Sequence, residues 1–212
     1  SANSVVLKWN TGKEVADDNL IPAGETRTVP KFTMICDAEK NYVYTILNDV
    51  IFTKDLQENI VKVIQGVITP LEINGDTLIT LTNLDSQNRI YLPKYNIAQN
   101  GIFISNIDSE ENTKFNFDDW TCKDNLYIEA LGNKVYKFGI DQTQDLPYIE
   151  FPEDIDLLIH EGLRIFYIQT DGFEGNISAN MLTDFYSESK YSETNSVITT
   201  SDITISNTSA IM

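Results

Sequence analysis

Hydrophobic and polar residues alternate with a period of two along most of this chain, the pattern of strands that bury one face. The clearest alternations lie at residues 5–9, 42–46, 102–104 and 164–168. Residues with turn chemistry separate such runs, namely Pro22-Ala23-Gly24, Asn74-Gly75-Asp76, Asn100-Gly101, Gly132-Asn133 and Asp171-Gly172. Strands of about five residues, spaced by about 8 to 12 residues, are typical of sandwiches and barrels. The pattern therefore predicts a mainly β fold made of sandwich-like or barrel-like antiparallel modules.

Helical patterns are few. Residues 152–159 carry acidic side chains early, where a helix dipole favours negative charge, and predict one or two helical turns. Residues 178–190 have apolar positions at i, i+3 and i+4 behind Ser178, a candidate N-cap, although several β-branched and aromatic residues there weaken the helix prediction. We therefore expect one or two short helices.

The distribution of strand patterns and turn residues predicts three sequential parts. Pro70 and Asn74-Gly75 interrupt the strands, so we expect an N-terminal β module at 1–72 and a second β-rich module at 73–193. The segment 194–212 is rich in Ser, Thr and Asn and predicts a polar terminal strand or tail. Because the sequence opens without an initiator Met and stops just after a strand-like stretch, we expect it to be a piece of a longer protein.

The net charge of the chain limits which classes of binding partner are expected. The formal net charge is −17 and the isoelectric point is near 4.2. Such a surface repels phosphate and anionic lipid, so we expect no nucleic acid and no membrane as partner. It favours basic partners or divalent cations. No segment approaches the roughly 18 to 20 consecutive apolar residues of a membrane span.

The sequence offers little support for a catalytic function. His160 is the only histidine, and no G-x-S-x-G elbow accompanies it, so we interpret it as a surface residue. Cys36 and Cys122 are far apart in the sequence and are predicted to be buried or half-buried thiols. One histidine and two cysteines also exclude metal sites built on clusters of these residues.

The carboxylates and tryptophans leave three alternatives to be weighed, which are calcium binding, glycoside hydrolysis and sugar binding. The clusters at 17–19, 108–111 and 118–119 are oxygen-rich, but none follows the calcium-loop pattern, and solvated acidic loops are the better interpretation. A glycosidase-like pair of carboxylates is defined by spatial separation, which the sequence does not give. Trp9 and Trp120 could line a sugar-binding groove, but core packing is favoured. We predict no catalytic residue, no cofactor and no bound metal.

The most distinctive stretch is residues 162–179. Within it, Tyr167, Thr170, Gly172, Gly175, Asn176 and Ile177 fall in the pattern Y-x-x-T-x-G-x-x-G-N-[VI]. This resembles the signature of the baseplate J-like and long baseplate-wedge proteins of contractile-tailed bacteriophages. Further stretches resemble the same family in the same order, at 21–26, 42–52, 63–66, 87–97 with 102–104, 135–137 with 147–151, and 203–207. A departure occurs at Phe151-Pro152-Glu153-Asp154, where the family has F-G-D-G.

The resemblance implies a non-enzymatic structural module of a phage tail baseplate that acts by protein–protein interaction. Its partners would be other tail and baseplate proteins, with copies of the parent protein joining in the assembly. It would be made in the bacterial cytoplasm and reside in the virion tail. The predicted structural turn and motif positions are Pro22, Gly24, Gly66, Gly172, Gly175 and Asn176. The alternatives are a carbohydrate- or receptor-binding module of a tail fibre and, third, a tail hydrolase.

Overall fold

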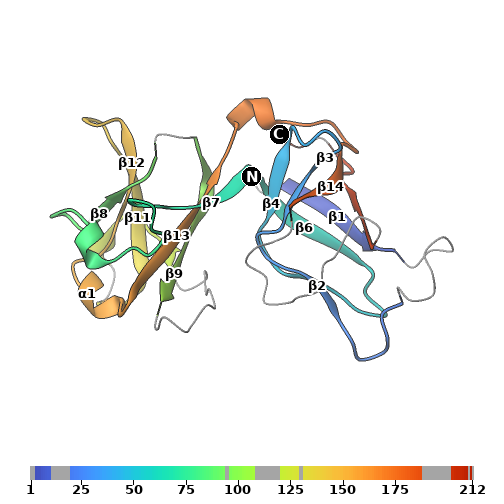
Figure 1. Ribbon diagram of the computed structural model, residues 1–212, viewed down its shortest axis with the longest axis horizontal. Coiled ribbons are helices and arrows are strands. Elements are labelled where there is room, and N and C mark those ends of the chain that lie inside the picture. The colour runs from blue at the N-terminus through green and yellow to red at the C-terminus, as the bar shows by residue number, and fades with distance from the viewer. Residues whose placement is uncertain are drawn as a thin grey trace. The chain divides into compact units, whose positions relative to one another are not determined.

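The computed structural model describes residues 3–10, 20–93, 96–107, 120–128, 131–187, 202–209 and 211. The chain forms two compact units, of which unit 1 comprises Ser1–Ile68 and Ile168–Met212 and unit 2 comprises Thr69–Tyr167. Unit 2 is therefore inserted into the sequence of unit 1. Each unit is built mainly of strands, so the predicted mainly β fold is confirmed (Figure 1).

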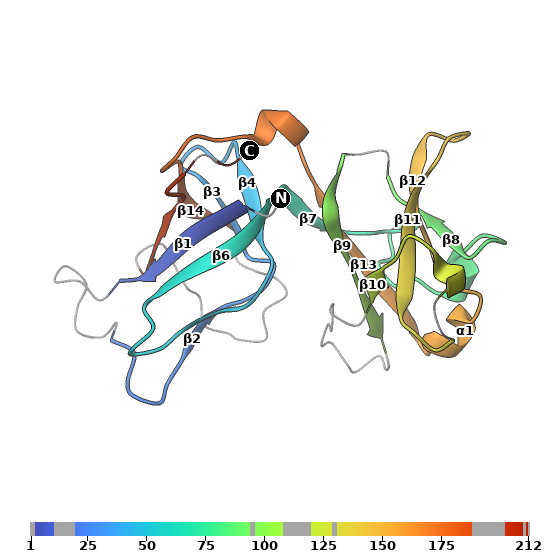
Figure 2. The ribbon, with the colours of Figure 1, turned by 180° about the vertical axis from the view of Figure 1, so that it is seen from behind.

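Unit 1 is organised around a six-stranded antiparallel sheet. In spatial order its strands are β14 (Leu182–Ser187), β3 (Met34–Asp37), β4 (Val43–Ile46), β6 (Glu58–Gln65), β1 (Asn3–Trp9) and β15 (Ile203–Ser206). The long neighbours β1 and β6 lie side by side in both views (Figures 1 and 2). A second sheet pairs β2 (Arg27–Val29) with β5 (Val50–Phe52). Leu7, Ile35, Tyr44, Ile46, Phe52 and Val63 are fully buried in the core of this unit.

The six-stranded sheet curls until its two edges nearly meet. Asn207, directly after β15, is fully buried, and its carbonyl oxygen accepts a hydrogen bond from the Asn180 amide at 2.7 Å. Its side-chain oxygen accepts one from the Leu182 amide at 3.0 Å, at the start of β14. These bonds tie the β15 edge to the β14 edge and give the sheet its barrel-like form.

Unit 2 holds a four-stranded sheet in the order β10 (Thr121–Cys122), β11 (Val135–Asp141), β12 (Leu146–Glu150) and β8 (Arg89–Tyr91). Only the β10–β11 pair in it is parallel. A three-stranded sheet orders β7 (Val67–Pro70), β13 (Gly162–Gln169) and β9 (Ile97–Ile107), and the chain passes between the units within β7 and β13. The short helix α1 (Ile155–Leu158) precedes β13, and 3-10 turns lie at Leu81–Asn83, Leu126–Ile128 and Gly172–Gly175.

One helix prediction is confirmed and the other is wrong. Residues 155–158 form α1, inside the predicted 152–159. Residues 182–187 form β14, although the helical spacing extended across 178–190, because Leu182 and Phe185 pair with Asp37 and Ile35 of β3. Residues 188–190 lie outside the described part of the chain. Tertiary pairing here overrides a weak local pattern.

The compact units differ from the sequential modules expected at 1–72, 73–193 and 194–212. The first boundary falls close to the division after Ile68, but residues 168–187 belong with unit 1. The predicted terminal strand forms at 203–206, and it has a partner within the unit, because Ile205 pairs with Leu7 of β1. Contacts between residues far apart in sequence therefore decide the division.

The predicted turns are largely confirmed, whereas the predicted alternation is clear in β1 but not in β13, which is buried at four successive positions, 165–168. In β1, Val5, Leu7 and Trp9 are buried while Lys8 is exposed. Strand β4 is instead buried on both faces. Positive φ angles mark the predicted turns at Gly24, Asn74, Gly75, Gly132 and Gly172. The predicted turn at Asn100-Gly101 is wrong, because both residues continue strand β9, where Asn100 has a φ of 61°.

Candidate functional site

Two of the predicted motif positions, Gly66 and Gly175, come together in one junction of unit 1, between Gly66 and the segment 168–177. A side chain at Gly66 would meet the backbone oxygen of Gln169, since an added Cβ would lie 2.2 Å from it. A Cβ at Gly175 would lie 2.3 Å from the side chain of Gln65. Gly66 is therefore a place where two backbone segments approach closely, and Gly175 is a place where the Gln65 side chain packs against the backbone. These motif positions serve packing.

Gln65 and Tyr44 fasten this junction. The side-chain oxygen of Gln65 accepts hydrogen bonds from the Thr170 hydroxyl and, at 3.2 Å, from the Asp171 amide. The buried Tyr44 hydroxyl donates to the Gly175 carbonyl at 2.6 Å. Burial raises the pKa of Tyr44 to about 12, which keeps the hydroxyl protonated as a donor. Neither residue was singled out from the sequence, because a strand Tyr or Gln carries no local sign of such a distant partner.

We expect Tyr44→Phe to lower the free energy of unfolding by about 1–2 kcal/mol, because the buried Gly175 carbonyl loses its donor while the ring stays in place. The free energy of unfolding is measured by urea denaturation, in which hydrogen exchange of the unit 1 amides reports the unfolding. The conservative control is Tyr186→Phe in β14, where the side chain is 36% exposed. Equal effects of the two changes would contradict a special role for the Tyr44 hydroxyl.

The other predicted motif positions are open to solvent. Pro22 and Gly24 form an exposed turn in which the Glu25 amide donates to the Pro22 carbonyl at 3.1 Å. Gly172 has a φ of 63° with open space beside it, and Asn176 is exposed. Pro22 and Gly24 thus serve a local turn, apart from the Gly66 junction.

The residues considered for chemistry do not converge. His160 is exposed, as expected, and lies two residues after the end of α1. Within the described ranges no three His, Cys, Asp or Glu side chains group as a metal site would require. The acidic clusters at 17–19, 108–111 and 118–119 lie outside those ranges.

The two tryptophans belong to the cores, which confirms the favoured interpretation. Trp9 lies 5.7 Å from Phe52 between ring centroids. Trp120 is 6% exposed, packs edge-on against Phe151 at 5.3 Å, and its ring nitrogen donates to Asn106 at 2.6 Å. Neither indole ring is available to stack on a sugar.

The cysteines differ from each other. Cys36 is buried, as predicted, whereas Cys122 is exposed, so that half of the prediction is wrong. Cys122 sits in β10, a two-residue strand at the edge of its sheet with both residues exposed. Burial, with the nearby Asp184 carboxylate, raises the pKa of the Cys36 thiol from 9.0 to about 11.

The raised pKa of Cys36 predicts that the stability of the fold depends on pH. Unfolded chains lose the thiol proton above pH 9.0, whereas the folded chain holds it to about pH 11, so rising pH favours unfolding across this window. We expect Cys36→Ala to flatten the decline of stability between those two values, measured by urea unfolding at a series of pH values. Cys122→Ala should leave the decline unchanged. An identical slope in Cys36→Ala and wild type would contradict the assignment.

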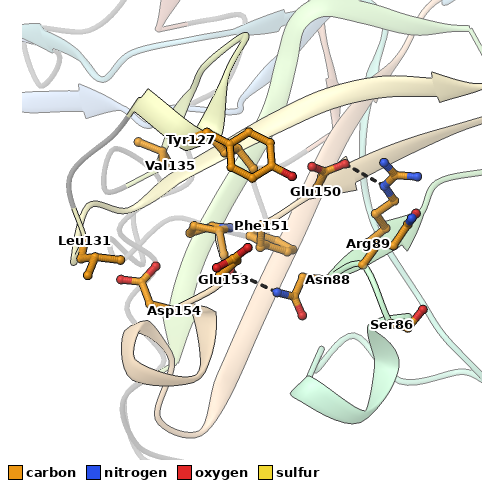
Figure 3. A pocket seen from close by; sticks show the side chains of 13 residues that line it. Ser86, Asn88, Arg89, Tyr127, Leu131, Val135, Glu150, Phe151, Glu153 and Asp154 are labelled. Carbon is orange, nitrogen blue, oxygen red and sulfur yellow. Dashed lines mark hydrogen bonds and ion pairs between the residues drawn. The ribbon is translucent and has the colours of Figure 1, made fainter.

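A pocket of about 350 Å³ opens in unit 2, lined by residues of the 86–89 stretch, the end of β12, the residues before α1, and Leu126, Tyr127, Leu131 and Val135 (Figure 3). Its lining residues are Ser86, Gln87, Asn88, Arg89, Leu126, Tyr127, Leu131, Val135, Glu150, Phe151, Pro152, Glu153 and Asp154. In the view of Figure 3, Arg89 and Glu150 lie on one side, Leu131 and Asp154 on the other, and Tyr127 and Glu153 between them. The stretch Phe151-Pro152-Glu153-Asp154, where the sequence departs from the family pattern, thus forms part of the wall.

Side-chain hydrogen bonds hold the frame of this pocket. Asp85 accepts from the amides of Gln87 at 2.8 Å and Arg89 at 2.9 Å, which shapes the 86–88 loop. The Asn88 side chain donates to the Pro152 carbonyl at 3.3 Å, and Asp154 accepts from the Gly132 amide at 2.7 Å. These hydrogen bonds hold the described residues on both sides of the pocket.

The Arg89 side chain is held in the pocket lining by contacts with neighbouring residues. Its Nε donates to Glu150 at 2.7 Å, and its guanidinium lies 4.4 Å from the centroid of the Tyr148 ring. The hydrogen bond to Glu150 raises the pKa of Arg89 above its ordinary value. A paired, stacked guanidinium supports the pocket and neutralises Glu150. Sequence analysis did not single out this site, because its residues come from strands and loops that are far apart in the sequence.

Comparison of the chain with family models, with curated proteins and with solved structures yields no match. Among the helices that the structure describes, none is long and apolar enough to cross a membrane.

Proposed function

We propose that this chain is a non-enzymatic assembly module of a bacteriophage tail baseplate and acts through protein–protein contacts. The observation that carries the contact role is the position of Tyr127 and Leu131, which are 85% and 84% exposed. Among the described residues these are the two most exposed large hydrophobic side chains, and both border the unit 2 pocket. An exposed Tyr beside a concave, partly apolar surface is typical of protein interfaces.

The assignment to a baseplate draws on the motif positions. Gly66, Gly175 and the residues around them carry the resemblance to the baseplate-wedge proteins, and their contacts in unit 1 are those of a packed junction. Residues needed for packing fit a structural module better than a catalyst. The charge of −17 favours basic protein partners over nucleic acid or anionic membranes. The proposed location is the virion tail, after synthesis in the bacterial cytoplasm.

Immunogold labelling tests this proposal. An antibody raised against residues 1–212 is applied to purified particles of the phage whose genome encodes the chain. We expect gold at the baseplate end of the tail, with preimmune serum as control. Absence of the chain from purified particles by mass spectrometry, or labelling of the capsid alone, would overturn the proposal.

Carbohydrate binding is a second candidate, favoured by one observation. The exposed Tyr127 ring borders a pocket whose lining also includes the amide side chains of Gln87 and Asn88 and the Glu153 carboxylate. Aromatic faces with nearby polar groups also suit sugars. A glycan array distinguishes the two functions: binding that disappears in Tyr127→Ala supports the sugar function, and no binding removes it. Trp120→Ala is unsuitable here, because Trp120 is a core residue.

A further inference from the structure

We propose that the unit 2 pocket receives an arginine side chain from a partner protein. This inference rests on the proposed assembly function and names the chemistry of the contact. It combines three features of the pocket, which are its unbalanced charge, its exposed aromatic ring and its size.

The charge of the lining is negative. Three carboxylates, those of Glu150, Glu153 and Asp154, face a single guanidinium, that of Arg89. Glu150 is neutralised by Arg89 at 2.7 Å. Asp154 uses one oxygen to accept from the Gly132 amide, and its other oxygen retains capacity to accept. The exposed Glu153 carboxylate has no hydrogen bond or ion pair with the described residues. A cation is therefore the complementary ligand.

The same pairing disfavours an anion. Arg89 is the cation within the lining, and it is held by Glu150 on one side and by the Tyr148 ring at 4.4 Å on the other. An anionic ligand would have to share the Arg89 guanidinium with Glu150 and approach the carboxylates of Glu153 and Asp154. Over longer range, the net charge of −17 steers basic surfaces toward the chain.

The aromatic ring and the size of the pocket favour arginine in particular. A planar guanidinium stacks on a Tyr face and donates two parallel hydrogen bonds to one carboxylate, which a lysine ammonium cannot do. Tyr127 provides an exposed ring and Glu153 a carboxylate in the same lining, and Leu131 offers apolar surface for the methylene stem. The volume of about 350 Å³ is near the lower end of the roughly 300–1,000 Å³ of ligand pockets, which suits one long side chain.

The test uses the ¹⁵N-labelled chain and a series of blocked amino acids in place of the partner. N-acetylarginine amide is titrated at low salt while the backbone amide signals of Gln87, Asn88 and Leu131 are followed by NMR. N-acetylcitrulline amide has nearly the same shape without the charge, and N-acetyllysine amide (free ε-amine) has the charge without the planar group. We expect saturable shifts with arginine, binding weaker by about fivefold or more with citrulline and lysine, and weakening by added salt.

Variants locate the binding. Glu153→Gln and Tyr127→Ala are each expected to weaken arginine binding by about fivefold. Glu161→Gln, an exposed carboxylate outside the pocket lining, is the matched control and should bind as wild type. Equal binding of arginine and citrulline, or unchanged binding in Glu153→Gln, would overturn the inference. Baseplate labelling by the antibody does not depend on this result, so the inference can fail while the proposed function stands.

Discussion

Gly66→Ala is expected to lower the free energy of unfolding of unit 1 by about 3–5 kcal/mol. Gly66 has a φ of 127°, in the region that L side chains rarely adopt. An added Cβ would lie 2.2 Å from the Gln169 carbonyl oxygen and 2.6 Å from a methyl carbon of Ile168. The oxygen belongs to the backbone, so relief requires moving the whole segment 168–175 away from Gln65.

Two controls separate the clash from the conformational strain. Gly24→Ala and Gly172→Ala also place a side chain at positive φ, at 86° and 63°, but in open space. Each is expected to cost about 1–2 kcal/mol. Hydrogen exchange of β4 and β6 amides reports the stability of unit 1 separately from unit 2. A cost at Gly66 no larger than at Gly24 would contradict the close approach of the two segments.

Asn207→Ala is expected to destabilise unit 1 by about 2–4 kcal/mol. The Asn207 side chain is fully buried, accepts from the Leu182 amide at 3.0 Å and donates to the Ser178 carbonyl at 2.7 Å and the Ser209 carbonyl at 3.1 Å. Alanine leaves all three backbone groups without a side-chain partner. The loss falls where the β14 and β15 edges of the sheet approach, so both strands should lose protection.

The matched control is Asn176→Ala, an exposed asparagine in the neighbouring motif, which should change stability by less than about 0.5 kcal/mol. Hydrogen exchange of the Leu182 and Ile205 amides measures the effect in each strand. Loss of protection at β15 alone, with β14 unchanged, would show that Asn207 does not couple the two edges.

The strands and turns that could be predicted from the sequence are those that depend on residues close together in the chain. The alternation at Val5, Leu7 and Trp9 defines β1, and Asn74-Gly75 marks a turn with positive φ at both residues. The 182–187 strand was missed because its decisive partner, β3, lies far away in the sequence. Insertion of unit 2 was missed for the same reason, since the pairing of β14 with β3 and of β15 with β1 shows that the chain returns to unit 1.

The candidate site was less predictable than the fold. Gly66 and Gly175 stood out through the resemblance, but their shared junction depends on Gln65 and Tyr44, whose partners are set by tertiary contacts. In the unit 2 pocket, Arg89 and Glu150 belong to adjacent strands, while Tyr127 comes from a separate segment. No spacing rule relates such residues, so only the folded chain brings them together.

The insertion of unit 2 also determines the order in which the strands of unit 1 become available during translation. Unit 2 is contiguous, so its strands are all available once residue 167 has left the ribosome. Strands β1, β3, β4 and β6 are made before it, but β14 and β15 follow only after it. While unit 2 is being translated, the edges of β1 and β3 lack these partners. We expect this interval to be when the nascent chain most needs a chaperone.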